Sequence, residues 1–386
     1  MNCDFEDKGA RAQALAGVKR VVIKLGTRLL MDIRGQEMPE RVASLVEQIA
    51  WLRGRGCEVV VVTSGAIGVA MRLREVKRRP KQIAMLQAYA ALGQSHLMAA
   101  YEKACNQHGF HCGQLLLTAA DLHDRERHVK VAQCLEALLE QGILPVINEN
   151  DSVSVDEIKV GDNDTLAALV ASMSRANLTI LLTTVDGLRQ REEGKGEALG
   201  ARISVVHELT PEVLALAGGT DGNQFSTGGM ATKLRAAAMT TLGGDPLWIA
   251  DGHDFGVLRK MFAGEDLGTI FLPNARTRLH AKQRYLAFFS EPEGELLVDA
   301  GAERAIREKG TSLLPSGVLA LRGVFQPGAT VRIVNTSRQE LARGTVNFSN
   351  ADLSKICGAG SDELARLLGY RPAATEAVHR NAMVLL

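Results

Sequence analysis

The feature that most constrains the fold of this chain is a regular alternation of short β-rich runs with long helical segments through its first two-thirds. Such an alternation predicts βαβ units, and hence a parallel sheet with helices on both faces. The expected strands are residues 20–25, 58–63, 114–118, 143–147, 179–183, 246–250 and 268–271. The expected helices are residues 39–53, 81–107, 124–141, 164–175 and 230–242. The sequence therefore predicts an α/β fold with a mainly parallel sheet.

This alternation stops after residue 271. The following stretch is polar and basic, and from about residue 293 short strands alternate with turns. A chain of 386 residues is long enough to form a second core. We therefore predict an α/β domain over residues 1–272, a linker over 273–292 and a small β-rich domain over 293–386.

Charge and composition exclude several classes of protein. The 45 Lys and Arg nearly cancel the 44 Asp and Glu, so no global field recruits nucleic acid or an anionic membrane. No apolar run approaches the roughly 20 residues that span a bilayer, and the N-terminus lacks the pattern of a secretory signal. Six scattered cysteines fit reduced thiols better than a disulfide framework. These features predict a cytoplasmic protein that holds any anion at a local site.

Two of the expected strands end in residues that suit a bound anion. Lys24 closes the first strand and Gly26 follows it, while Ser64 and Gly65 follow the second. Ligands of open α/β sheets bind at the carboxyl edge, where glycine lets backbone amides approach phosphate and lysine supplies a charge. An ordinary turn and a plain helix cap are the alternative interpretations of these two motifs.

Further polar residues follow the strand expected at 143–147. Asn148 and Asp151 belong to a polar run that is costly at the end of a buried strand unless something organises it, so a functional role is favoured. Asp162 and Asp164 precede the next helix, and a capped helix start explains one of these acids but not both. The surplus carboxylate could orient lysines or a metal.

A glycine-rich segment opens the helix expected at 230–242 and places Lys233 in its first turn. Because a helix N-terminus disfavours cations, a lysine there points to an anion nearby, although a solvated lysine is the alternative. Another set with metal-binding chemistry comprises Cys105, His108, His111 and Cys112. Four ligands within eight residues rarely close a zinc site, so this set is disfavoured.

Taken together and in this order, the motifs resemble those of the bacterial glutamate 5-kinases of the amino-acid kinase family. The residues that carry the resemblance are 24–27, 63–66, 148–151, 159–164 and 227–233. The C-terminal part looks like the PUA domain appended to those enzymes, through residues 294–299, 310–315 and 377–380. Kinases of the same fold that act on aspartate, carbamate, uridylate or N-acetylglutamate lack that second domain, so the combination is specific.

The resemblance implies a three-layer αβα fold like that of carbamate kinase, followed by a PUA pseudo-barrel. It implies transfer of phosphate from ATP, with Mg²⁺, to the γ-carboxylate of L-glutamate, giving L-glutamyl 5-phosphate in the first step of proline biosynthesis. Feedback inhibition by proline, a homodimer or homotetramer, and coupling to glutamate-5-semialdehyde dehydrogenase are implied as well.

The resemblance also assigns roles to individual residues. Lys24 and Lys233 would neutralise the transferring phosphoryl group, and Asp162 would hold both lysines in place. The residues expected to bind glutamate are Ser64, Asn148, Asp151 and Asn163. The residues expected to contact ATP are Lys24, Gly26, Thr183, Thr184, Thr227, Gly228, Gly229, Met230, Ala231, Thr232 and Lys233. No residue is assigned as a metal ligand.

Four residues depart from the pattern of the family: Arg28, Thr184, Arg189 and Ser226. Thr184 stands where an acid is usual, which leaves the nucleotide preference open. A kinase of the same fold acting on a related acid is one alternative, and an RNA-binding regulator is another. The near-neutral charge and few aromatic residues of the C-terminal part disfavour RNA binding, so we expect none.

Overall fold

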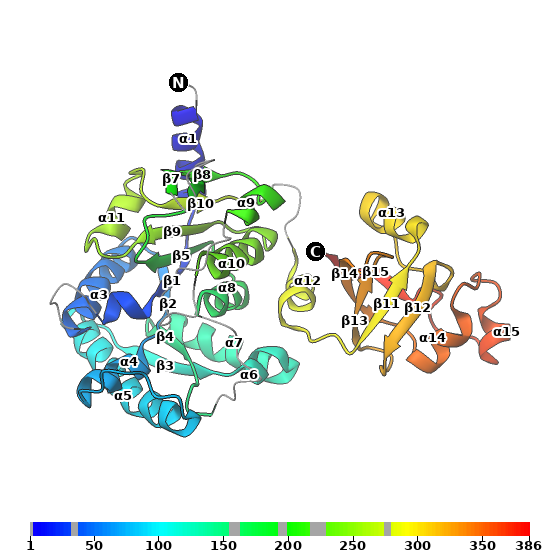
Figure 1. Ribbon diagram of the computed structural model, residues 1–386, viewed down its shortest axis with the longest axis horizontal. Coiled ribbons are helices and arrows are strands. Elements are labelled where there is room, and N and C mark those ends of the chain that lie inside the picture. The colour runs from blue at the N-terminus through cyan, green and yellow to red at the C-terminus, as the bar shows by residue number, and fades with distance from the viewer. Residues whose placement is uncertain (1–2, 32–37, 154–162, 192–198, 217–228, 274–278) are drawn as a thin grey trace. The chain divides into compact units, whose positions relative to one another are not determined.

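The chain forms two compact units in the computed structural model (Figure 1). The structure describes residues 3–31, 38–153, 163–191, 199–216, 229–273 and 279–386. The first unit comprises Met1–Leu122 and Glu126–Arg278, and the second comprises His123–Arg125 and Leu279–Leu386. The sequence places a linker at 273–292, whereas helix α12 (Ala281–Arg284) and a π-helical turn at Tyr285–Phe289 already belong to the second unit.

The first unit is built on an eight-stranded sheet with the order β3-β4-β2-β1-β5-β9-β10-β8 (Figure 1). Its strands are β1 (Arg20–Leu25), β2 (Glu58–Val62), β3 (Cys112–Leu117), β4 (Leu144–Glu149), β5 (Leu178–Thr183), β8 (Val205–Val206), β9 (Leu247–Asp251) and β10 (Thr269–Phe271). Neighbouring strands are parallel except β9 and β10, which are antiparallel. The prediction of a mainly parallel sheet is confirmed, and the carboxyl ends of β1, β2, β4 and β5 meet at one edge.

Helices cover both faces of this sheet: α3 and α11 lie on one side and α8 and α10 on the other (Figure 1). The helices up to residue 262 are α1 (Cys3–Leu15), α2 (Thr27–Leu30), α3 (Met38–Gly54), α4 (Ala66–Leu73), α5 (Ile83–Gln107), α6 (Ala119–His123), α7 (Arg125–Glu140), α8 (Asn163–Ser174), α9 (Pro211–Ala215), α10 (Met230–Leu242) and α11 (Val257–Phe262). A short hairpin of β6 (Arg189–Arg191) and β7 (Leu199–Arg202) follows β5. The predicted strands and helices match these elements within about two residues.

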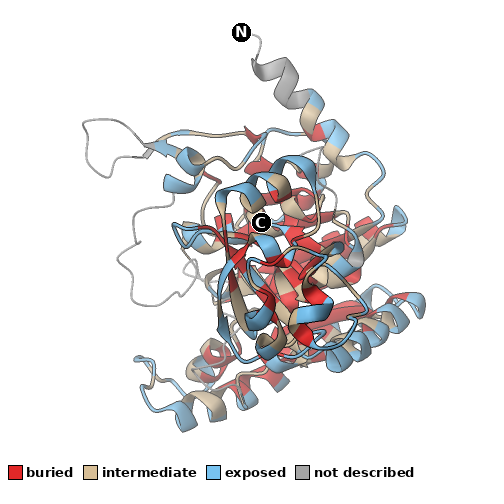
Figure 2. Cartoon of the chain, turned by 90° about the vertical axis from the view of Figure 1, so that its right-hand side faces the viewer, coloured by how far each residue is buried: buried red, intermediate tan, exposed pale blue. Residues whose placement is uncertain are grey.

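The side chains of β1 alternate between the two faces of the sheet. Val21, Ile23 and Leu25 belong to a core that includes Leu45 of α3 and Tyr101 of α5. Because successive strand residues point to opposite faces, the intervening Lys24 faces α8 and α10. Figure 2 shows the buried residues gathered along the strands and the exposed ones on the outer surfaces of the helices. This arrangement buries the side chain of Lys24 on the face of the sheet that α8 and α10 cover.

The second unit is a five-stranded sheet with the order β12-β11-β13-β14-β15. Its strands are β11 (Gly294–Val298), β12 (Val318–Gly323), β13 (Thr330–Val334), β14 (Glu340–Val346) and β15 (Val378–Leu385), and its longer helices are α13 (Ala300–Lys309), α14 (Asn350–Ile356) and α15 (Leu364–Leu368). It has a core of its own, with Phe325, Ile333 and Leu353 fully buried. The predicted β-rich domain is confirmed. In the described part of the chain, no helix is both long and apolar enough to span a bilayer.

Candidate active site

Two buried lysines from different elements share one carboxylate at the edge of the sheet. Lys24 Nζ, at the end of β1, lies 2.6 Å from Asp164 Oδ1, and Lys233 Nζ, in the first turn of α10, lies 3.0 Å from Asp164 Oδ2. Asp164 is fully buried at the start of α8, and the lysines are 8% and 5% exposed. We call these three residues the lysine cluster. Its two ammonium groups and one carboxylate leave a net positive charge inside the protein.

The carboxylate of the lysine cluster is held in its ionised form. Burial raises the pKa of Asp164, but Lys24 and Lys233 outweigh that effect and bring it to about 2. The hydroxyl of Thr232 lies 3.0 Å from Asp164 Oδ2. Because one negative charge offsets only one of two ammonium groups, the cluster suits a ligand that brings further negative charge.

The sequence assigned the position between the lysines to Asp162. That residue lies outside the described part of the chain, and the carboxylate found between the lysines is that of Asp164. The two acids lie two residues apart, and the motif alone predicted a surplus carboxylate there; only the resemblance assigned the role to Asp162. Helix α8 packs against β1 and β5 and thereby directs Asp164 to the face where Lys24 lies.

Ser64 lies at the turn from β2 into α4. Its hydroxyl donates a hydrogen bond to the Leu25 carbonyl (3.0 Å) and accepts one from the hydroxyl of Thr27 (3.1 Å). Gly65 has a φ of +92°, a conformation that favours glycine, so the chain can turn sharply there. Ser64 is thereby placed beside the end of β1, immediately after Lys24.

Asn163 connects the ends of β2 and β4. Its Nδ2 donates to the Thr63 carbonyl (2.6 Å) and to Asn148 Oδ1 (3.1 Å). Asn148 Nδ2 in turn donates to Oε1 of Gln94, a buried residue of α5. The structure thus brings Asn148 and Asn163 together, and Asn163 immediately precedes Asp164. Gln94 was missed because nothing near it in the sequence distinguishes it from other helix residues.

The remaining predicted residues are distributed along the same edge. Gly26 N–H donates to the Leu182 carbonyl (3.3 Å), and the Thr183 carbonyl accepts from Gly252 (2.8 Å). Thr184 begins the loop after β5, and Asp151 lies in the turn after β4. The segment Gly229, Met230, Ala231, Thr232 forms the start of α10, where backbone N–H groups are free of intrahelical partners. Thr227 and Gly228 lie outside the described residues.

The cysteine and histidine set near the end of α5 makes a different local arrangement. His111 Nδ1 lies 2.7 Å from Glu102 Oε1, and the Cys112 N–H donates to Glu102 Oε2 (3.0 Å). Within the ranges that the structure describes, no three His, Cys, Asp or Glu residues form a group that could hold a metal ion. These contacts fasten the end of a helix to the next strand.

Comparison with known proteins yields two matching families. The model of the amino acid kinase family matches residues 19–251, and that of the PUA domain matches residues 294–368. Glutamate 5-kinase of Moorella thermoacetica is 43% identical over 373 residues, covering 97% of this chain and 98% of that protein. Glutamate 5-kinase of Trichlorobacter lovleyi is 42% identical, covering 97% and 99%. Among solved structures, carbamate kinase from Giardia lamblia bound to AMP-PNP has 18% identity and a TM-score of 0.48, covering 67% of this chain and 99% of that one.

Proposed function

This chain belongs to the amino acid kinase family, a family of phosphotransferases, and carries a C-terminal PUA domain; we propose that it transfers the γ-phosphate of ATP to the γ-carboxylate of L-glutamate, giving L-glutamyl 5-phosphate. The observation that carries this proposal is the lysine cluster at the carboxyl edge of the sheet. The names of the full-length relatives support glutamate as the acceptor.

The chemistry of the reaction agrees with the residues present. A glutamate carboxylate is already ionised and nucleophilic at neutral pH, so no side chain has to remove a proton from it. The transfer instead needs alignment of the two substrates and positive charge on the phosphoryl oxygens. Among the described residues, Asp164 is the hydrogen-bond acceptor found for Lys24 Nζ and for Lys233 Nζ. An ammonium group has three N–H donors, so with respect to the described residues each lysine has donors left for phosphoryl oxygens.

We assign the substrate residues as follows. Ser64, Asn148, Asp151 and Asn163 bind glutamate, because they lie at or just after the carboxyl ends of β2 and β4 or begin α8, the helix that carries Asp164. The residues assigned to ATP are Gly26, Thr183 and Thr184 with the segment from Thr227 to Lys233, through backbone N–H groups at the start of α10. Asp162, to which the resemblance assigns the positioning of both lysines, lies outside the described residues; we propose that Asp164, which contacts both lysines, has this role as well.

Mg²⁺ fits this site as a companion of the nucleotide. Mg²⁺ keeps several waters and is usually held by one or two carboxylates together with the phosphates of the substrate, and its charge would add to that of the lysines. A dedicated cage of three or more acidic, His or Cys side chains is absent from the described ranges.

The similarity to glutamate 5-kinases supports further proposals about the wider role of this chain. We propose that the product enters proline biosynthesis, that proline inhibits the enzyme, and that the chain works in the cytoplasm as a homodimer or homotetramer. We also propose functional coupling to glutamate-5-semialdehyde dehydrogenase, since an acyl phosphate hydrolyses readily and profits from rapid use. We expect no binding to RNA.

The direct test is release of ADP by the purified full chain with Mg²⁺ and ATP, supplied in turn with glutamate, aspartate and N-acetylglutamate. We expect turnover with glutamate and little with the other two acids. Turnover with only one of the other acids would contradict the proposal. Addition of proline to the glutamate reaction tests the proposed inhibition in the same assay.

A further inference from the structure

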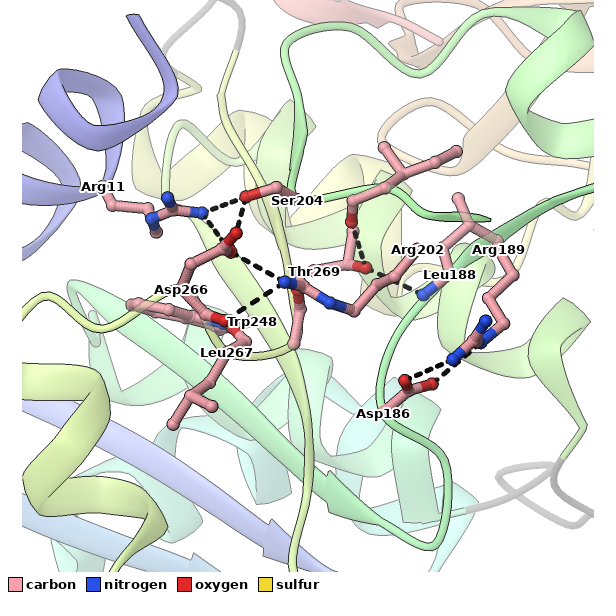
Figure 3. Close-up of polar contacts among 12 residues, drawn as sticks. Arg11, Asp186, Leu188, Arg189, Arg202, Ser204, Trp248, Asp266, Leu267 and Thr269 are labelled. Atoms are coloured by element: carbon pink, nitrogen blue, oxygen red, sulfur yellow. Dashed lines mark hydrogen bonds and ion pairs between the residues drawn. The ribbon is translucent and has the colours of Figure 1, made fainter. Parts of the chain in front are cut away.

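One buried hydroxyl lies behind the loop that leaves the end of β5, residues 184–188. Thr269, the first residue of β10, is fully buried. Its Oγ1 accepts a hydrogen bond from the Leu188 N–H (2.8 Å) and donates one to the Ile203 carbonyl (2.6 Å). The single hydroxyl therefore joins the two ends of the segment that contains the hairpin β6–β7 (Figure 3).

The loop fits closely against this hydroxyl. Gly187 has a φ of +138°, and a Cβ placed there would lie only 2.5 Å from Thr269 Oγ1. Leu188 is buried, and its carbonyl accepts from the Ile203 N–H (2.8 Å). The path of the chain from Thr184 to Leu188 is thus fixed at its far end by contacts with Thr269.

Thr269 is itself held by the turn that precedes it. Trp248 Nε1 donates to the Leu267 carbonyl (2.7 Å), and Arg202 donates to the carbonyls of Gly268 and Asp266 (Figure 3). Because side chains from β9 and β7 hold this turn in place, the position of the Thr269 hydroxyl relative to the loop is fixed.

We propose that Thr269 is a positioning residue for the nucleotide: it sets the 184–188 loop so that Thr183 and Thr184 are preorganised for ATP. This inference rests on the proposed function, which places ATP at the end of β5. Thr269 acts through the loop and touches neither substrate. Removing its hydroxyl would leave the buried Leu188 N–H and Ile203 carbonyl without that partner, which favours other loop conformations.

The test compares two substitutions at this position. Thr269→Val keeps the shape of the side chain and removes both hydrogen bonds, whereas Thr269→Ser keeps the hydroxyl. We expect Thr269→Val to raise the KM for ATP and the Kd for AMP-PNP with Mg²⁺ about tenfold. The KM for glutamate and kcat at saturating ATP should stay within about twofold, and Thr269→Ser should restore nucleotide binding.

The matched control is Thr179→Val, a similar change at the other end of β5. Thr179 is buried, and its Oγ1 has no hydrogen-bond partner among the described residues. This variant should bind AMP-PNP as the wild type does. Wild-type nucleotide affinity in folded Thr269→Val, or equal losses in Thr269→Val and Thr269→Ser, would overturn the inference.

Calorimetric binding of AMP-PNP separates this inference from the proposed function. If the wild type binds AMP-PNP but does not phosphorylate glutamate, the proposed function fails while the role of Thr269 is still measured. If Thr269→Val does not fold, amide hydrogen exchange of the wild type tests the inference in place of the binding measurement on the variant. The Leu188 amide should then exchange slowly and more slowly still with AMP-PNP; rapid exchange unchanged by the nucleotide would contradict the role.

Discussion

Two regions of the first unit hold one carboxylate between two cations, and they differ in what surrounds the charges. In the lysine cluster the side chain of the shared acid is 1% exposed. In the second region the shared acid is half exposed, and its cations lie 2.6 and 2.9 Å from it (Figure 3). We call this second group the arginine cluster; its members are Arg11, Arg202 and Asp266.

The two clusters also differ in the acceptors around the cations. Arg11 also donates to the hydroxyl of Ser204, and Arg202 donates to two backbone carbonyls. Each arginine therefore has an acceptor in the protein besides Asp266. Arginine forks of this kind fasten the N-terminal helix and β7 to the turn before β10. The lysines share a single acceptor in the described part of the chain. The comparison teaches that the burial of the shared carboxylate, more than the number of charges around it, distinguishes the two clusters.

The largest effect should come from removing a lysine of the lysine cluster. We expect Lys233→Ala to lower kcat by about 10²–10³-fold with a much smaller change in the KM for glutamate, because the charge acts on the transferring group. The corresponding change in the arginine cluster, Arg11→Gln, should leave kcat at saturating ATP nearly unaltered. Steady-state kinetics of both variants measure this contrast, and near-normal turnover by Lys233→Ala would remove the lysine from its assigned role.

A second contrast concerns stability. Asp164→Asn leaves two buried ammonium groups without their counter-charge, so the free energy of unfolding should fall by about 3–5 kcal/mol. Asp266→Asn should cost about 1 kcal/mol, because water solvates the half-exposed arginine cluster. Urea unfolding of the two variants gives both values. Equal losses would show that burial does not separate the clusters.

The third prediction concerns pH. The pKa of Asp164 is lowered to about 2, so its ionised form contributes stability that is fully present above its unfolded pKa of about 4. That contribution is lost as the pH falls from about 4 through 2. The stability difference between wild type and Asp164→Asn should therefore be constant above pH 5 and shrink in acid. A difference that disappears near neutral pH would contradict the assignment.

The smallest expected effect is one of salt. Raising the ionic strength from 0.1 to about 1 M shortens the Debye length to about 3 Å, which screens exposed charges more than buried ones. The cost of Asp266→Asn should therefore fall by a few tenths of a kcal/mol, while that of Asp164→Asn should hardly change. The same urea titrations at two salt concentrations test this, and a strong salt effect on Asp164→Asn would indicate that water reaches the lysine cluster.

The sequence predicted most of the fold because hydrophobic periodicity and strand length are local signals. It also predicted Lys24 and Lys233, since each lies at a position where an isolated lysine is unusual. The motif holds two acids and its sequence does not say which of them meets the lysines. Asp164 does so from the start of α8, while the role assigned to Asp162 stays a prediction, because that residue lies outside the described part of the chain.

Other parts of the site carry no local signal. Gln94 reaches Asn148 from a helix far away in the sequence, and Thr269 reaches the loop after β5 from a strand 81 residues on. The arginine cluster likewise joins residues 255 positions apart. Such contacts depend on how the strands are ordered in the sheet, which neither composition nor periodicity specifies.

One consequence of the start of α8 concerns substrate size. Asn163, which we assign to the amino acid, and Asp164, which contacts the two lysines that we assign to the phosphoryl group, are consecutive residues of one helix. A rise of about 1.5 Å per residue fixes their separation. Neither can move toward a shorter or longer acid unless the other moves too. The helix therefore sets the length of the acid that can accept the phosphoryl group. A preference for a shorter or longer acid would have to come from residues on other elements.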